Sequence, residues 1–245
     1  MTRVLFVTNG HGEASIADRI AVELRRLDPS IALEHLGLVG DALSETMQEV
    51  GPQRSMPSGG LIAMGNVRNI ARDVRAGLLG LTLRQYRFLR SVRGRYDAAV
   101  AIGDVYALVM TLAARAPTIF VGTAKSVNFA PYGPFEERVL RLASARFVRD
   151  DATVERLRAH GLDVEPAANV IVDLYAVEDD PRAGAAVEGF APVLALFPGS
   201  RESAYGDAAF LLSVVRELAK SRPQLGAVLS IARNLDASRF AEVAR

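Results

Sequence analysis

Short apolar runs alternate with amphipathic stretches along most of this chain, joined by turns rich in glycine. The first apolar run covers residues 4–8, continues into Asn9-Gly10-His11-Gly12-Glu13, and leads into an amphipathic segment over residues 15–27. Continuous β-branched runs are typical of strands buried on both faces of a parallel sheet. The pattern therefore predicts a strand, a glycine turn and a helix whose N-cap is Ser15.

The same alternation continues through the middle of the chain. It predicts strands over 31–36, 98–102, 118–121, 145–148 and 170–172, helices over 104–114 and 151–160, and a polar turn over 122–134. Strands that alternate with helices at short intervals indicate an α/β fold with a doubly wound parallel sheet.

The strand–turn–helix pattern returns near the end of the chain. An apolar run over 193–197 meets Pro198-Gly199-Ser200-Arg201, and a helix over 205–220, a strand over 227–231 and a last helix from Asp236 follow. The stretch 179–192 is acidic and then rich in Gly and Ala, with two prolines, as in a linker. We expect an N-terminal Rossmann-like domain over 1–178, a linker over 179–192 and a partial C-terminal domain over 193–245. About fifty residues are too few for a self-sufficient α/β half, so either this half completes the first sheet or the chain is truncated, and we favour truncation.

Residues 65–95 hold eight arginines against the single acid Asp73. Apolar residues recur among them at helical spacing, and Gly77 and Gly80 interrupt the run. Two interpretations stay open. The apolar stripe packs on the sheet with the arginines solvated, or the segment lies on an anionic lipid surface, and both can hold on different faces of the segment.

Composition narrows the function classes. The 245 residues carry a net charge of +1, which argues against a general nucleic-acid binder. The absence of cysteine excludes disulfides, thiolate catalysis and cysteine-ligated zinc. No apolar run reaches the ~18–20 residues of a membrane span. We expect a cytoplasmic protein.

Both glycine turns offer the same chemistry. A strand that feeds a helix through such a turn aims backbone N–H groups and a helix N-terminus at one point, which suits a phosphate. Two such turns suggest two Rossmann-like halves that face each other across a cleft. The spacing Gly10-x-Gly12-x-x-Ser15, with Glu34 downstream, also approaches a dinucleotide-binding fingerprint, and a dehydrogenase stays an alternative.

Six motifs in order along the chain resemble those of lipid-A-disaccharide synthases, and more closely those of the proteins related to these synthases. They are Asn9-Gly10-His11-Gly12-Glu13-Ala14-Ser15, Gly103-Asp104-Val105-Tyr106, Gly122-Thr123-Ala124-Lys125-Ser126, Phe147-Val148-Arg149-Asp150-Asp151, Asn169-Val170-Ile171-Val172-Asp173 and Pro198-Gly199-Ser200-Arg201. In the first motif, Ile16 replaces a glycine of the synthases and Asp18 is displaced by one residue. The resemblance therefore favours a related lipid glycosyltransfer over lipid A synthesis itself.

This resemblance implies a bacterial GT-B glycosyltransferase with two Rossmann-like domains. It implies inverting transfer of a hexosyl group from a UDP-sugar to a lipid-linked acceptor at the inner face of the membrane. Residues 65–95 would meet the anionic lipid surface. We expect no metal, no cofactor and no nucleic-acid partner.

The resemblance also assigns site residues. Asp104 is the expected catalytic base, although an Asp in this place supplies a helix N-cap equally well. Glu13 and His11 are the other candidates for this role. The expected acceptor-binding residues are Gly10, Gly12, Ser15, Lys125, Asn169 and Asp173. The expected nucleotide-sugar-binding residues are Gly199, Ser200, Arg201 and Glu202.

Two further functions stay open. One is a lipid-surface-binding Rossmann module without catalysis, which predicts vesicle binding that weakens with salt. The other is a sugar-nucleotide epimerase of the same fold, which predicts turnover of the nucleotide sugar without an acceptor.

Overall fold

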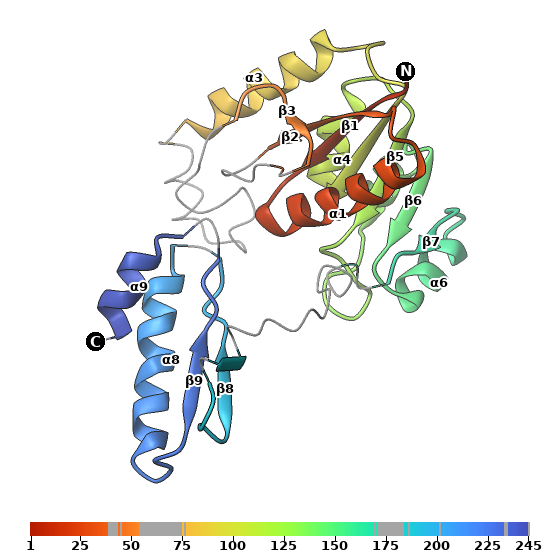
Figure 1. Cartoon of the computed structure of the whole chain (residues 1–245). Coiled ribbons are helices and arrows are strands. Elements are labelled where there is room, and N and C mark those ends of the chain that lie inside the picture. Colours follow the sequence, from red (N-terminus) through yellow and green to blue (C-terminus); the bar gives the residue numbers. More distant parts are fainter. Residues whose placement is uncertain are drawn as a thin grey trace. The chain divides into compact units, whose positions relative to one another are not determined.

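A computed structural model describes residues 1–38, 44, 46–53, 75, 77–168, 170, 184–185, 187–200, 202–232 and 235–244. The chain divides into two compact units, Met1–Tyr175 and Ala176–Arg245 (Figure 1). Each unit is described by itself below.

Unit 1 is built on a sheet whose strands are all parallel. Among the described residues the sheet has seven strands in the order β3-β2-β1-β4-β5-β6-β7. Their bounds are β1 Arg3–Thr8, β2 Ala32–Gly37, β3 Gln48–Glu49, β4 Ala98–Gly103, β5 Thr118–Gly122, β6 Ala145–Val148 and β7 Glu165–Pro166. The strand order reverses between β1 and β4, so the predicted doubly wound parallel sheet is confirmed, with its switch point between these two strands.

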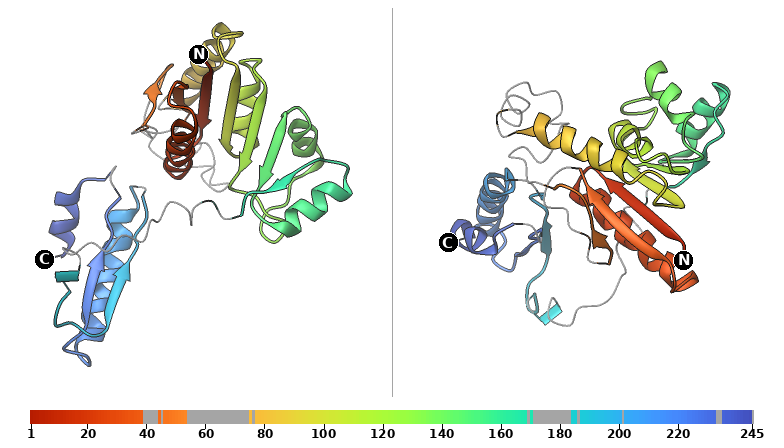
Figure 2. Two further views of the ribbon diagram at one scale, coloured as in Figure 1. Left: turned by 45° about the vertical axis from the view of Figure 1, so that its right-hand side comes forward. Right: turned by 90° about the horizontal axis from the view of Figure 1, so that it is seen from above.

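Helices cover both faces of this sheet (Figure 2). They are α1 His11–Leu27, α3 Leu78–Ser91, α4 Val105–Leu112, α5 Pro134–Leu140 and α6 Asp151–Ala159. Val4 and Phe6 of β1 pack with α1, while Leu5 and Val7 pack with α3 and α4. Successive strand residues point to opposite faces, so one continuous apolar run fills both layers. Helices α5 and α6 pack with α4 on the side away from α1.

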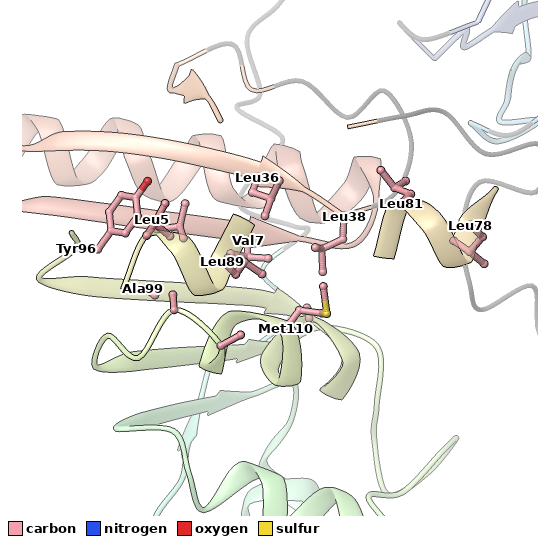
Figure 3. Close-up of a cluster of buried hydrophobic side chains, with 14 residues drawn as sticks. Leu5, Val7, Leu36, Leu38, Leu78, Leu81, Leu89, Tyr96, Ala99 and Met110 are labelled. Atoms are coloured by element: carbon pink, nitrogen blue, oxygen red, sulfur yellow. The ribbon is translucent and has the colours of Figure 1, made fainter. Parts of the chain in front are cut away.

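The apolar stripe of α3 is part of the core (Figure 3). Leu78, Leu81, Leu89 and Val92 are all buried against β1, β2 and α4. The helix begins directly after Gly77, whose φ of 97° is a backbone conformation that favours glycine. The predicted break at Gly77 and the packing interpretation are therefore confirmed for this part of the segment, whereas Gly80 lies inside α3 and does not split it. Residues 65–74 lie outside the described residues.

Helix α1 begins four residues earlier than its pattern predicts. Its N-cap is Gly10, so the turn consists of Asn9 and Gly10 alone, and the predicted N-cap at Ser15 is wrong. The Ser15 hydroxyl donates to the His11 carbonyl at 3.2 Å, and Asp18 accepts from the Thr46 hydroxyl at 2.8 Å instead of capping the helix. Gly10 itself is extended, with a φ of −176°.

Two other differences concern the end of unit 1. Helix α5 begins at Pro134, the last residue of the predicted polar turn, and the pattern did not predict it. The strand expected over 170–172 falls largely outside the described residues, and β7 lies earlier in the chain.

Unit 2 is a smaller strand–helix–strand–helix arrangement. It contains β8 Val193–Leu196, α8 Ala204–Ala219, β9 Gly226–Leu229 and α9 Ala237–Ala244. Among the described residues β8 and β9 form a separate two-stranded parallel sheet, and the predicted order of elements is confirmed. Residues 179–183 of the expected linker lie outside the described residues, so its boundaries stay a prediction.

Candidate functional site

The carboxyl ends of β1 and β4 meet at the switch point of unit 1. Thr8 at the end of β1 pairs with Ile102, next to Gly103 at the end of β4. Gly103 has a φ of 130°, and a Cβ atom there would lie 2.1 Å from Oδ1 of Asn9. Glycine therefore lets the Asn9 side chain lie directly against the end of β4.

Glu13 lies in the first turn of α1 and folds back over the turn. A Cβ atom on Gly10 would lie 2.5 Å from Oε2 of Glu13, so the carboxylate rests against this glycine. The Thr123 hydroxyl, which follows β5, donates to Oε1 of Glu13 at 3.3 Å. A carboxylate of the chain itself thus meets the positive end of the α1 dipole.

Asp104 follows Gly103 and is 6% exposed. Its Oδ1 accepts from the backbone N–H of Ala107 at 3.2 Å, so Asp104 is the N-cap of α4. Burial raises the pKa of Asp104, and the negative charge of Glu13 raises it further, against the opposing effect of the backbone hydrogen bonds. The expected N-cap is confirmed. A capping carboxylate whose pKa is raised can also take up a proton.

The end of β5 completes this edge of the sheet. Gly122 pairs with Gly103, and the backbone N–H of Thr123 donates to the Gly103 carbonyl at 3.1 Å. A Cβ atom on Gly122 would lie 2.5 Å from the hydroxyl oxygen of Tyr132, a buried side chain. Sequence reasoning missed both Thr123 and Tyr132 as site residues. The polar turn directly after a strand was the signal that could have found them.

Lys125 holds the 122–134 turn together. Its Nζ donates to Oε2 of Glu136 at 2.8 Å and lies 5.7 Å from the centroid of the Tyr132 ring. The same Glu136 oxygen accepts from the Gly133 N–H at 2.8 Å, at the start of α5. The role expected for Lys125 in acceptor binding stays a prediction.

The remaining acceptor-side residues lie around or outside this edge. His11 and Gly12 occupy the first turn of α1, and Gly12 and Ser15 are exposed. Asn169 and Asp173 lie outside the described residues. The structure therefore brings Asn9, Gly10, Glu13 and Asp104 to one edge.

Glu34 does not lie at this edge. It pairs with Leu5 in the middle of β2, is buried, and accepts hydrogen bonds from Arg3 at 2.6 Å and from Arg95 at 3.1 Å. The ribose-binding role considered for Glu34 is therefore wrong, because the strand carries it away from the carboxyl end.

The second glycine turn lies in unit 2. Gly199 has a φ of 102°, and among the described residues, its two chain neighbours aside, no atom lies within 4 Å of the position that a Cβ atom would take. Ser200 is exposed, and Glu202 forms an ion pair with Arg239 at 2.9 Å. The Arg239 guanidinium lies 3.6 Å from the centroid of the Tyr205 ring. Arg201 lies outside the described residues.

The strand order, the switch point and the second strand–turn–helix unit define an α/β fold of the GT-B type. Three solved structures illustrate the likeness. An S. aureus MnaA–UDP structure has a TM-score of 0.61 at 13% identity, over 100% of this chain and 65% of that chain. A putative UDP-N-acetylglucosamine 2-epimerase from Listeria monocytogenes has a TM-score of 0.60 at 16% identity, over 99% and 65%. A ugt transferase from Siraitia grosvenorii in complex with UDP has a TM-score of 0.52 at 14% identity, over 98% and 64%.

The chain thus spans about 65% of the length of the first two solved structures. At 13–16% identity, the likeness to these structures shows a shared fold. No family model and no curated protein matches the sequence. Within the described residues, no helix combines the length and the apolar character that crossing a bilayer requires.

Proposed function

We propose that this chain belongs to a UDP-sugar-dependent glycosyltransferase that transfers a hexosyl group to a lipid-linked acceptor with inversion. Unit 1 binds the acceptor, and unit 2 binds the nucleotide. The observation that carries the proposal is the pair of carboxylates, Glu13 and Asp104, at the switch point of the unit 1 sheet. Open α/β sheets bind their ligands at this place. The fold shared with structures of UDP-sugar enzymes supports the same assignment.

The chemistry follows from the buried carboxylate. Asp104 accepts the proton of the acceptor hydroxyl, and the hydroxyl oxygen attacks the anomeric carbon from the face opposite to UDP. The bond to UDP breaks as the new bond forms, so the configuration inverts and UDP leaves with the electron pair. A raised pKa brings Asp104 closer to the working pH and makes it a stronger base. In unit 2, backbone N–H groups around Gly199 and Ser200 are our candidates for binding the diphosphate of the donor.

The side chains on the exposed face of α3 are an argument for a lipid-linked acceptor. Leu79, Leu83 and Tyr86 lie on this face and are 66%, 47% and 39% exposed. Three exposed arginines accompany them on the same helix, namely Arg84, Arg87 and Arg90. The helix contains no acidic residue. Exposed apolar side chains among arginines suit the interface of an anionic membrane.

The reaction is tested by measuring UDP release from a panel of UDP-hexoses, with and without a crude bacterial lipid extract as acceptor. The assay uses the 245-residue chain and any longer product of the same reading frame. We expect UDP release that increases when lipid is added. No release above background from any donor would contradict the proposal.

Membrane association is tested by co-sedimentation with vesicles that contain phosphatidylglycerol. Replacing Arg84 and Arg87 with Glu should abolish binding, because both charges lie on the exposed face of α3. The matched control replaces Arg19 and Arg26 of α1 with Glu, an equal charge change on the other face of the sheet. Equal loss in both variants would contradict a specific lipid-binding face.

An epimerase is the second candidate, and the same pair of carboxylates favours it. Two carboxylates beside one bound sugar can remove a proton from carbon and return one to it. Such an enzyme turns over a UDP-sugar in D₂O with deuterium incorporation at the sugar carbon. This result, without net UDP release and without dependence on lipid, would replace the transferase proposal.

A further inference from the structure

We propose that the hydroxyl of Tyr132 is a ligand-binding group that donates a hydrogen bond to an oxygen of the acceptor at the ends of β4 and β5. The acceptor part bound there is a neutral, hydroxyl-bearing group such as a sugar. The inference rests on the proposed function and names the chemistry of its acceptor site.

The hydroxyl lies at the functional edge of the sheet. Tyr132 is 2% exposed, and its oxygen occupies the space beside Gly122 that a Cβ atom would fill. Gly122 pairs with Gly103, the residue before Asp104. Burial raises the pKa of Tyr132, and the negative charges of Glu136 and Asp104 raise it further. The phenol therefore keeps its proton and can only be useful as a donor or a neutral acceptor.

Within the described residues, the Tyr132 hydroxyl has no protein hydrogen-bond partner. Three buried side-chain atoms in the described part of the chain lack one: Nε of Arg3, Oε1 of Gln85 and the Tyr132 oxygen. Arg3 donates through its Nη2 and Gln85 through its Nε2, whereas the hydroxyl is the single polar group of the Tyr132 side chain. Burying such a group costs stability, and phenylalanine would fill the same volume without this cost.

The neighbouring groups indicate what the hydroxyl would bind. Glu13 and Asp104 offer carboxylate oxygens at the same edge, and Thr123 offers a hydroxyl that already donates to Glu13. A sugar hydroxyl can donate to a carboxylate and accept from a phenol at once. A phosphate would be repelled by the two carboxylates. The arrangement therefore favours a neutral polyol over an anion at this edge.

The turn that carries Tyr132 is held in place from both ends. Lys125 binds Glu136 at the start of α5, and the Val127 N–H donates to the Thr153 hydroxyl of α6 at 3.0 Å. The phenol is thus positioned before a ligand arrives, as a binding group must be.

The test replaces Tyr132 with Phe and measures stability and ligand binding separately. We expect the melting temperature to rise by at least ~2 °C, because an unpaired buried hydroxyl is removed. We expect binding of N-acetylglucosamine, used as the probe and followed by saturation-transfer NMR, to weaken at least about tenfold, as for a lost hydrogen bond.

Tyr96→Phe is the matched control. Tyr96 is also buried, but its hydroxyl donates to Oε2 of Glu34 at 2.5 Å, away from the site. This variant should lower the melting temperature and leave probe binding unchanged.

Three results would overturn the inference: probe binding that survives Tyr132→Phe, a lower melting temperature in this variant, or no probe binding by the wild-type protein. A lower melting temperature would assign the hydroxyl to an internal hydrogen bond through water. Binding of the probe that depends on Tyr132, in a protein that releases no UDP, would contradict the proposed function and leave the inference standing. UDP release that is unaffected by Tyr132→Phe would contradict the inference and leave the proposed function standing.

Discussion

Each unit has one strand–turn–helix segment that we call an elbow: β1, Gly10 and α1 form the first, and β8, Gly199 and α8 form the second. The two elbows share a sequence pattern but differ in the atoms that lie near their glycines. In unit 1, Gly10 lies against the Glu13 carboxylate, and Gly103 lies against the Asn9 side chain. In unit 2, no described residue other than the two chain neighbours of Gly199 has an atom within 4 Å of the position of a Cβ atom there. Strand β1 before the first elbow is almost wholly buried, whereas two of the four residues of β8 before the second are exposed.

The sequence pattern predicts phosphate binding at both elbows, but the difference between them favours proton transfer at the first and phosphate binding at the second. The first elbow is closely packed and carries carboxylates, so it suits proton transfer and hydroxyl recognition more than phosphate binding. The glycine of the second elbow has a positive φ, so its requirement there is one of backbone conformation. Phosphate binding is therefore best sought at Gly199 and proton transfer at Asp104.

The largest expected effect is that of Asp104→Asn. If Asp104 is the base at the first elbow, kcat should fall by about 10²–10⁴-fold in the UDP-release assay. The melting temperature should change little, because Asn caps a helix as well as Asp does. Asp150→Asn is the control, since Asp150 caps α6 in the same way through the Thr153 N–H. Equal activity in the two variants would leave Asp104 with a capping role alone.

The second effect compares the glycines directly. Gly103→Ala should lower the free energy of unfolding by about 2–4 kcal/mol, because the new Cβ both strains the backbone and meets the Asn9 side chain. Gly199→Ala should cost only about 1 kcal/mol, from backbone strain alone. Urea denaturation of both variants measures the difference. Equal costs would contradict the close packing of the first elbow.

The third effect is a pH dependence of stability. Folded Asp104 holds its proton more tightly than in the unfolded chain, because burial raises its pKa above the ordinary 3.8. The free energy of unfolding that depends on this group therefore decreases as the pH rises from 3.8 through the raised pKa. Urea midpoints over this range should show the decrease in the wild-type protein, a smaller decrease in Glu13→Gln, and none from this site in Asp104→Asn. Identical pH profiles for wild type and Asp104→Asn would contradict the raised pKa.

The smallest effect belongs to the second elbow. Removing the Glu202–Arg239 ion pair with Glu202→Ala should leave the urea midpoint unchanged within error, because both side chains are about half or more exposed. A clear loss of stability would show that this elbow is held as firmly as the first.

The sequence predicted the elements of the switch point well. β1, β4 and β5 lie within one residue of the runs that predicted them, and Asp104 caps α4 as its place after Gly103 suggested. These features depend on local periodicity and on the residue types that helix ends favour. The start of α1 was misplaced because Ser15 matches a capping pattern, whereas Gly10 makes the tighter turn.

The candidate site was only partly predictable. Asp104 and Glu13 were named from motifs, but their mutual charge effect and the burial of Asp104 required the folded arrangement. Tyr132 was missed because nothing in its local sequence shows that its hydroxyl reaches Gly122. Glu34 was misjudged because spacing from the glycines does not give its distance from the end of β2.

The order of strands and helices, the two glycine elbows and the acidic residue after β4 are properties of the sequence itself, because each depends on neighbours within a few positions. The packed chain alone decided that Glu13 closes the first elbow with Thr123, 110 positions away, and that Tyr132 lies against Gly122. Parallel strands bring distant turns to one edge, and the side chains that meet there are determined by sheet order and register. The local sequence pattern determines neither the order of the strands in the sheet nor their register.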